Sequence, residues 1–238
     1  MRLLASVLLT GAATVSQAGP TLDRIQQTGT ITLAHRESPV PFSFLDGTGK
    51  PVGYAIDLCL RLVEAMRKQL RLSSIKVEYL QVTAATRIAA IAEGRAALEC
   101  GSTTDNIERR QRVAFTVPHY IAGARYLVHA DSTLTGLADF EHKTLVSTKG
   151  TTPLKAIEKA NRERLMGIKV IEAADHAAAV DMVESGEAAG FAMDDVLLYG
   201  LISTRPDPAQ GRGQVPDHRA AGHHAAARRP RTEEARRR

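Results

Sequence analysis

The sequence lacks tryptophan, and its 238 residues include only ten aromatic residues and two cysteines. Neither Cys59 nor Cys100 has the ligand spacing of a zinc site, so no metal is expected. After the N-terminus, no segment is apolar enough to span a bilayer, which takes about 20 apolar residues. The remaining composition, 44% apolar, is that of an ordinary soluble protein and excludes a fibrous or wholly disordered chain. The length allows one large or two small domains.

An excess of positive charge is missing from the body of the chain. The formal net charge is +5, but residues 206–238 hold eight arginines and four acidic residues. The remaining 205 residues carry 23 basic and 22 acidic side chains, so the body gives no support for a nucleic-acid-binding domain. The tail, residues 205–238, has one branched apolar residue, Val215, and is expected to be disordered because it cannot bury enough apolar surface to fold.

Enzyme motifs are missing too. Gly47-Thr48-Gly49-Lys50 is superficially similar to a phosphate-binding loop, but Pro51 follows and the six-residue frame is absent, so a hairpin turn is expected. No Gly-x-Ser-x-Gly elbow occurs. His218, His223 and His224 lie in the tail. No catalytic residue or cofactor is therefore expected.

The first 18 residues predict a secretory signal peptide. Arg2 supplies the positive charge, an apolar stretch follows, and Ser16-Gln17-Ala18 is typical of a cleavage site. The alternative is a fraying N-terminal helix. Cleavage after Ala18 would place the product outside the cytoplasm, in the periplasm or secreted. In that oxidising compartment Cys59 and Cys100 could form a disulfide, the alternative being two buried free thiols.

Short apolar segments alternate with amphipathic ones along the chain. Strands are expected at 31–34, 75–79, 97–100, 145–147, 169–172 and 189–193, helices at 86–93, 106–112, from 153 onward and at 177–185, and an extended segment at 124–128. Another helix is predicted after Tyr54, with Ile56, Cys59, Leu60, Val63, Met66 and Leu70 on its apolar face. Two successive βαβ series predict a two-lobed α/β protein with mainly parallel sheets.

Polar residues follow six of the expected strands, at the edge where ligands bind in open α/β sheets. They begin at His35, Thr83, Gly101, Gly150, Asp175 and Asp194. Each has a local alternative: Thr104 or Asp105 as a helix N-cap, Thr152 as an N-cap, and Arg87 as a solvated helix residue. Six such sites supplying Arg, His, Thr and Asp favour a small charged ligand.

Several motifs together resemble one family. They are Thr28-Gly29-Thr30-Ile31-Thr32-Leu33, His35-Arg36-Glu37-Ser38, Val40-Pro41-Phe42-Ser43-Phe44, Gly53-Tyr54-Ala55-Ile56-Asp57-Leu58, the run from Glu99 to Arg109, and Phe191-Ala192-Met193-Asp194-Asp195. The chain resembles the periplasmic solute-binding proteins of polar amino-acid ABC uptake systems, in particular those for glutamate and aspartate. The resemblance implies the type II two-lobed architecture, a periplasmic location, a membrane permease as partner and a monomer.

The resemblance also implies ligand-binding roles. Arg109, with the amides near Ser102 and Thr104 and with Thr152 from the other lobe, would hold the α-carboxylate. Asp194 would accept the α-ammonium. Arg36, Arg87 and His176 would surround the side-chain carboxylate as three cations, which favours acidic over neutral amino acids. Ala84 stands where the family can place a serine, so one hydrogen bond is in doubt.

The resemblance ends near residue 205, where such a protein would return to complete its first lobe. The expected division is a signal peptide (1–18), lobe 1 (19–122), lobe 2 (123–204) and a tail (205–238). The Arg/Ala/Pro-rich tail is typical of a shifted reading frame, so we expect an incomplete first lobe. Two other functions stay open: a dehydratase-like enzyme, with Glu37 or His176 as its acid or base, and a non-functional truncated product.

Overall fold

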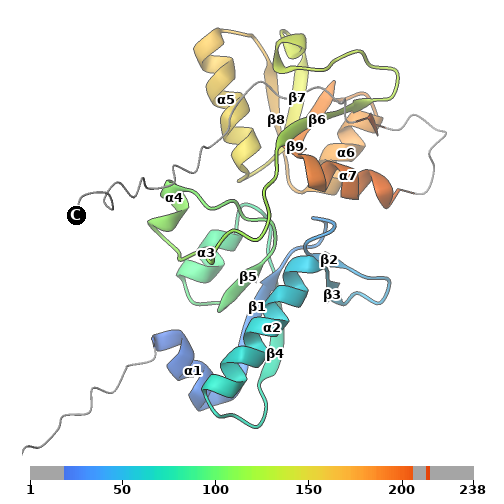
Figure 1. Cartoon of the computed structure of the whole chain (residues 1–238). Helices are drawn as coiled ribbons and strands as arrows, with labels where there is room; N and C mark the ends of the chain where they lie inside the picture. Colours follow the sequence, from blue (N-terminus) through green and yellow to red (C-terminus); the bar gives the residue numbers. More distant parts are fainter. Residues whose placement is uncertain (1–18, 206–212, 215–238) are drawn as a thin grey trace, which may run out of the picture.

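The computed structural model describes residues 19–205 and 213–214 and consists of two lobes, each built around its own β-sheet (Figure 1). Lobe 1, taken as the predicted residues 19–122, contains a three-stranded sheet in the order β4-β1-β5. Lobe 2, taken as the predicted residues 123–204, contributes four strands to a five-stranded sheet in the order β10-β6-β9-β7-β8, and its fifth strand, β10, comes from residues 213–214 of the tail. The predicted signal peptide, and the predicted tail apart from residues 205 and 213–214, lie outside the described residues.

Apart from an added N-terminal helix, α1, lobe 1 follows the predicted order of elements. In chain order these are α1 (Pro20–Thr28), β1 (Thr30–His35), β2 (Phe44–Leu45), β3 (Pro51–Val52), α2 (Tyr54–Gln69), β4 (Lys76–Gln81), α3 (Arg87–Ala92), β5 (Leu98–Cys100) and α4 (Ile107–Arg110). β1 pairs in parallel with both β4 and β5, which confirms the predicted parallel arrangement. The hairpin β2-β3 forms around the predicted turn, so the phosphate-loop interpretation is excluded by structure as well.

The core of lobe 1 joins one face of α2 to the sheet. It consists of Ile25, Ile31, Leu33, Ile56, Cys59, Val63 and Cys100. Cys59 and Cys100 form a disulfide that ties α2 to the end of β5, which confirms the predicted pairing. Leu60 was predicted on the apolar face but is exposed, because the buried face of α2 is narrower than the apolar stripe of its sequence.

Lobe 2 has the larger sheet. Its elements are β6 (Ala124–His129), a 3-10 helix η1 (Leu137–Phe140), β7 (Thr144–Thr148), α5 (Thr152–Arg164), β8 (Lys169–Ala173), α6 (His176–Glu184), β9 (Gly190–Asp194), α7 (Asp195–Ser203) and β10 (Gly213–Gln214). β7 pairs in parallel with β8 and β9, whereas β6 pairs antiparallel with β9. The sheets are thus mainly parallel, as predicted.

Four features depart from the sequence-based expectation. The helices α1, η1 and α7 were not predicted; the continuous apolar run of α7 lacks the one-sided pattern of a surface helix. The tail was expected to be disordered, but Gly213–Gln214 form β10, which pairs antiparallel with the edge strand β6. A two-residue strand needs only backbone hydrogen bonds, so the apolar-poor sequence did not reveal it.

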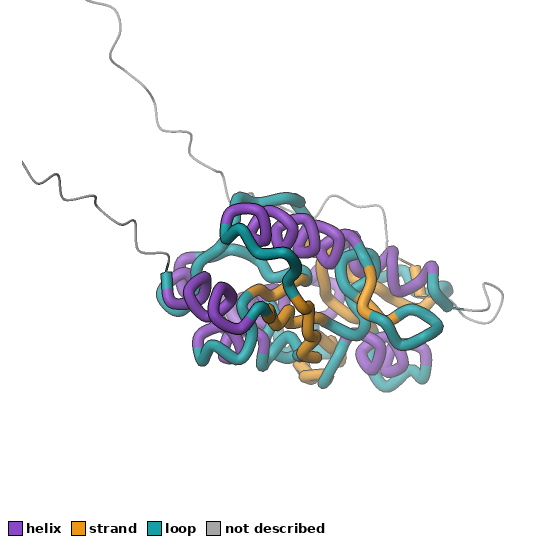
Figure 2. Tube along the Cα trace, turned by 90° about the horizontal axis from the view of Figure 1, so that it is seen from below, coloured by secondary structure: helices purple, strands orange, loops and turns teal. Residues whose placement is uncertain are grey.

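The two lobes touch directly. Phe42 and Ala55 of lobe 1 pack into the main core of lobe 2, with α7 residues such as Leu197. On the rim, Lys155 of α5 donates to both carboxylate oxygens of Glu108 of α4, at 2.6 and 2.7 Å. Figure 2 shows the Cα trace of the chain from below, with the strands lying between helices. None of the helices in the described ranges is long and apolar enough to cross a bilayer.

Candidate functional site

The candidate site lies where the carboxyl ends of the two sheets face each other. In lobe 1, Arg36 directly follows β1, Arg87 begins α3, and Arg109 lies in α4 beyond β5. In lobe 2, Thr152 begins α5, His176 begins α6, and Asp194 ends β9 and caps α7. Parallel strands bring their carboxyl ends to one edge, so residues far apart in sequence converge.

Three arginines in lobe 1 are almost completely buried. Their exposed fractions are 2% for Arg36, 3% for Arg87 and 8% for Arg109. The alternative interpretation of Arg87 as a solvated helix residue is therefore wrong. Burial lowers the pKa of all three guanidinium groups, and that of Arg87 to about 9, with repulsion from Arg36 and Arg109 contributing. All three stay charged at neutral pH, and burying three like charges together is costly without an anion.

Arg109 links the two lobes through backbone acceptors. Its Nη1 donates to the carbonyl oxygen of Thr104 at 2.7 Å, and its Nη2 donates to the carbonyl oxygen of Gly150 in lobe 2 at 3.1 Å. The backbone of Arg109 is fixed by the Asn106 side chain, which caps α4 and accepts from the Arg109 N–H at 2.9 Å. Asn106 is thus the N-cap, not Thr104 or Asp105 as the local alternative supposed.

Arg36 and Arg87 keep unused donors. The backbone N–H of Arg36 donates to the buried hydroxyl of Ser43 at 2.9 Å, which fixes the loop after β1. Within residues 19–205 and 213–214, the buried atoms Arg36 Nη1 and Arg87 Nε have no hydrogen-bond partner. Buried donors without acceptors are rare, because each costs about 1–3 kcal/mol. Unpaired guanidinium donors in a cluster are suited to an anionic ligand.

His176 is buried, with 1% exposed, and touches both lobes. Its Nδ1 lies 2.7 Å from the hydroxyl of Thr148, and its Nε2 lies 3.5 Å from Nη2 of Arg36. Burial, with the nearby charges of Arg36 and Arg87, holds the pKa of His176 well below its usual range. The expectation that Arg36, Arg87 and His176 form three cations is therefore wrong: the two arginines are charged, whereas His176 is neutral and its Nε2 can accept from Arg36.

Lobe 2 brings two acidic groups towards this cluster: Asp175, whose charge acts on Arg36, and Asp194, whose pKa is shifted. Burial raises the pKa of Asp194 to about 6, and Asp195 adds to this effect, whereas Arg87 and Arg109 act in the opposite direction. Asp194 is ionised at neutral pH and desolvated. A partly buried carboxylate of this kind is suited to a ligand ammonium.

The threonines predicted from the two lobes meet in the structure. The hydroxyls of Thr104 and Thr152 lie 3.3 Å apart across the interface. Thr152 is the first residue of α5, and the N-cap is Thr151, whose hydroxyl accepts from the Leu154 N–H. The N-cap alternative for Thr152 is therefore wrong, and its hydroxyl faces the other lobe. Ser102 lies in the loop after β5 and is partly buried.

Sequence reasoning missed Glu99. Among the neighbouring charges, the Glu99 carboxylate has the largest effect in raising the pKa of Arg36, Arg87 and Arg109. This effect opposes that of burial, which lowers the pKa of all three. In the part of the chain that the structure describes, its Oε1 is buried and without a hydrogen-bond partner. Glu99 lies inside β5, one residue before its end, so a search restricted to residues after strands passes over it. Thr148, which holds His176, ends β7 and was missed although it fits the strand-end rule.

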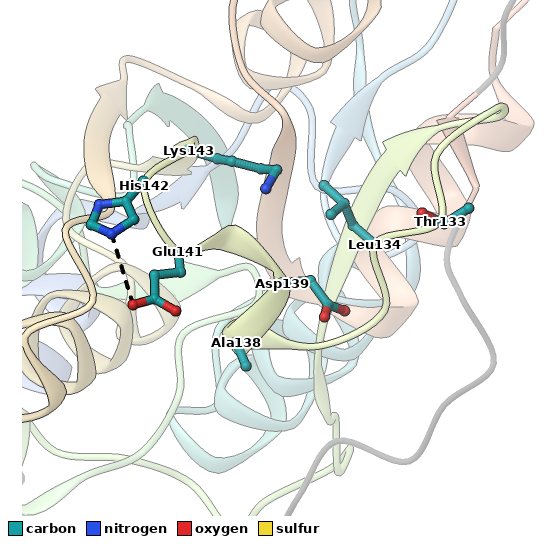
Figure 3. A pocket seen from close by; sticks show the side chains of 7 residues that line it. All are labelled: Thr133, Leu134, Ala138, Asp139, Glu141, His142 and Lys143. Carbon is teal, nitrogen blue, oxygen red and sulfur yellow. Dashed lines mark ion pairs between the residues drawn. The ribbon is translucent and has the colours of Figure 1, made fainter.

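The pocket drawn in Figure 3 lies elsewhere in lobe 2. It is a hollow of about 450 Å³ around η1, lined by Thr133, Leu134, Ala138, Asp139, Glu141, His142 and Lys143. The carboxylate of Asp139 accepts hydrogen bonds from the backbone N–H groups of Thr135 and Gly136 in its own turn. His142 and Glu141 form an exposed pair at 3.8 Å. Its charged groups are solvated, so we place the candidate site at the arginine cluster instead.

Comparison with known proteins agrees with the two-lobed fold. Residues 31–186 match the bacterial extracellular solute-binding proteins, family 3. The chain belongs to this family. Its members are extracellular solute-binding proteins rather than enzymes, which confirms the predictions of solute binding, of a location outside the cytoplasm and of no catalytic activity.

Two similar relatives cover most of the chain. The L-glutamate/L-aspartate-binding protein of Pseudomonas aeruginosa is 41% identical over 207 residues, which span 86% of this chain and 68% of that protein. The glutamate/aspartate import solute-binding protein of Escherichia coli is 38% identical over 226 residues, spanning 92% and 75% respectively. At this level of identity over this length, they share the family and its fold.

Solved structures show the same fold. The crystal structure of the ancestral amino acid-binding protein AncCDT-1, a precursor of cyclohexadienyl dehydratase, has a TM-score of 0.65 at 28% identity and covers 75% of this chain and 76% of its own. A mutant of ArgBP from T. maritima has a TM-score of 0.68 at 20% identity, covering 82% and 83%. The predicted type II periplasmic binding-protein architecture is confirmed.

Proposed function

We propose that this family member binds an acidic amino acid, glutamate or aspartate, between its two lobes and delivers it to the membrane permease of an ABC importer. The observation that carries the proposal is the cluster of three buried guanidinium groups in lobe 1. A dicarboxylate ligand satisfies such a cluster, because each guanidinium fork matches a carboxylate. The names of the 38–41% identical relatives support the same ligand class.

The proposed division of the ligand follows the two ends of an amino acid. Arg109, with Ser102, Thr104 and Thr152, holds the α-carboxylate, and Asp194 accepts hydrogen bonds from the α-ammonium. Arg36 and Arg87, whose unused donors need acceptors, hold the side-chain carboxylate. His176 is a neutral member of this group, oriented by Thr148. Glutamine would lose the charge-assisted bonds and leave guanidinium donors under-paired.

The proposal includes the cellular setting. A signal peptide at residues 1–18 would direct the chain to the periplasm, where lobe 1 (19–122) and lobe 2 (123–204) would act as a monomer. The disulfide between Cys59 and Cys100 suits that oxidising compartment. A permease that receives amino acid from the closed protein is the partner that this role requires.

Calorimetric titration of the full chain with glutamate, aspartate, glutamine and arginine tests the proposal. We expect glutamate or aspartate to bind, with glutamine at least thirtyfold weaker and arginine without measurable binding. Arg87→Ala should weaken glutamate binding while leaving glutamine little changed, because only the acidic side chain uses that guanidinium. Tighter binding of glutamine or arginine than of either acidic amino acid would contradict the assignment.

A further inference from the structure

Lobe 2 meets the backbone of lobe 1 at Gly150. A Cβ atom at this position would lie 2.7 Å from Cα of Ala85, 2.8 Å from the carbonyl oxygen of Ala84 and 2.9 Å from the nitrogen of Ala85. Non-bonded carbon contacts are near 3.5–4.0 Å, so any side chain at Gly150 would overlap lobe 1. The three atoms belong to the backbone, and no rotamer change can move them aside.

A second contact of the same kind lies at Gly200 in α7. A Cβ there would lie 2.2 Å from the carbonyl oxygen of Val40 and 2.7 Å from its carbonyl carbon. Glycine inside a helix costs about 1 kcal/mol relative to alanine, so Gly200 does not stabilise α7. The close approach of the Val40 backbone from lobe 1 explains why this position has no side chain.

Both contacts adjoin the arginine cluster. The carbonyl oxygen of Gly150 accepts from Arg109, and Ala84 and Ala85 lie in the turn that leads into Arg87. Val40 belongs to the loop that follows Arg36, next to Phe42, which packs into the core of lobe 2. The closeness of the two backbones therefore determines how tightly the cluster is enclosed.

We propose that Gly150 and Gly200 determine how far the lobes close, and through closure how firmly the ligand is held. Neither glycine donates a side-chain atom to the ligand, so both are positioning residues. With alanine at Gly150, lobe 2 must stay back from lobe 1, and the bond from Arg109 to the Gly150 carbonyl and the approach of Thr104 to Thr152 are lost. The effect on ligand affinity rests on the proposed function, whereas the effect on closure does not.

The test compares Gly150→Ala and Gly200→Ala with Gly186→Ala. Gly150 and Gly186 share nearly the same left-handed backbone, with φ of +78° and +77°, but a Cβ at Gly186 meets no atom within 4 Å. The control therefore carries the backbone strain without the clash. We measure the melting temperature without ligand, the glutamate affinity by calorimetry, and the radius of gyration by solution scattering with and without glutamate.

We expect Gly150→Ala to lose at least thirtyfold in glutamate affinity, Gly200→Ala at least tenfold, and Gly186→Ala less than threefold. Both test variants should keep a larger radius of gyration than the wild type at saturating glutamate. A melting temperature of Gly150→Ala well below that of Gly186→Ala would mean that the backbone strain at Gly150 exceeds that of the control. In that case the glutamate affinity and the radius of gyration of Gly200→Ala, a substitution that favours its helix, decide whether the proposal holds.

Two outcomes would overturn the proposal. One is glutamate affinity in Gly150→Ala and Gly200→Ala equal to that of Gly186→Ala. The other is a radius of gyration that is the same in all four proteins, a result that counts whether or not glutamate binds. Failure of the wild type to bind glutamate, with wider lobes in the two test variants, would instead contradict the proposed ligand and leave the closure contacts supported.

Discussion

Lobe 1 places three buried guanidinium groups at the interface, whereas the lobe 2 groups that face them are a neutral histidine, threonine hydroxyls and a carboxylate. The hydrophobic cores of the two lobes also differ, and the larger one is in lobe 2. The cores of lobe 2 are built on a five-stranded sheet and include Phe42 and Ala55 of lobe 1. The core of lobe 1 is built on a three-stranded sheet and contains a disulfide.

The difference shows how the chain separates charge from packing. Burying three cations opposes folding, and lobe 1 offsets this with Glu99 beside the cluster and with a covalent link between α2 and β5. Lobe 2 contributes no arginine to the cluster and supplies the apolar surface on which Phe42 packs. Each lobe can therefore be tested by the property in which it differs from the other.

The largest expected effect is on the charge of lobe 1. Arg109→Ala removes a buried guanidinium that bonds to both lobes and, under the proposed function, pairs with the α-carboxylate of the ligand. Loss of one member of a buried charged pair costs about 3–5 kcal/mol. Glutamate affinity should fall by about a hundredfold or more, as measured by calorimetry.

Arg110→Ala is the matched control, because Arg110 is the next residue of α4 but is exposed and pairs with Asp105. It should change affinity less than twofold. Equal losses in the two variants would remove Arg109 from the site.

The next effect is on the stability of lobe 1. The bonded cysteines are 41 residues apart, and in the chain-entropy account a disulfide closing a loop of this length contributes about 4 kcal/mol. In the double variant Cys59→Ala/Cys100→Ala, amide exchange should accelerate in β1 and β5, while β7 and β9 keep their protection. Equal acceleration in both lobes would mean that the lobes unfold as one unit.

Lowering the pH should weaken glutamate binding through Asp194 of lobe 2. The pKa of Asp194 is raised to about 6 in the ligand-free protein, and the ligand ammonium binds its ionised form. Glutamate affinity should therefore be constant above about pH 7 and fall about tenfold between pH 7 and pH 5. The same raised pKa means that the ligand-free protein takes up a proton as the pH falls towards 5, so this group's contribution to stability rises while affinity falls.

Asp194→Asn provides the check, since its affinity, although lower, should not change across this range. Burial and the charges of Arg36 and Arg87 hold the pKa of His176 well below its usual range, so His176 should add no step near that range. A steep pH dependence that persists in Asp194→Asn would assign the titration to another group.

The smallest effect concerns the rim. Lys155 and Glu108 form an exposed pair between the lobes, and such pairs contribute about 0.2–1 kcal/mol. Lys155→Ala should weaken glutamate binding by no more than about fivefold, mostly through faster release. Lys159→Ala, which breaks an exposed pair with Glu163 within the same helix, should leave the release rate unchanged.

Much of this arrangement could be predicted from local sequence. Strand positions, the hairpin and the disulfide followed from apolar patterning, turn residues and the placement of two cysteines. The positions of Arg36, Arg87 and His176 near strand ends also followed, whereas Arg109 was expected only from the family resemblance. What local sequence does not carry is desolvation: the neutral state of His176 comes from its burial beside arginines that lie 140 and 89 residues away in sequence.

Glu99 and Gly200 show the same limit in another form. Glu99 reads as one more residue of a strand, and Gly200 as a weak point in a helix, until the opposite lobe or the neighbouring arginines are in place. Their roles depend on contacts between distant segments, and single-residue propensity contains no information about such contacts.

The placement of all three arginines in lobe 1 also sets the order of events when a ligand arrives. An anion approaching the separated lobes is attracted by lobe 1 alone, so the association rate should follow the charge of that lobe and decrease with ionic strength. Contacts from lobe 2, such as that of Thr152, form only after the first encounter and govern how long the ligand stays. Under the proposed function, capture would therefore depend on lobe 1, whereas retention would depend on contacts from both lobes.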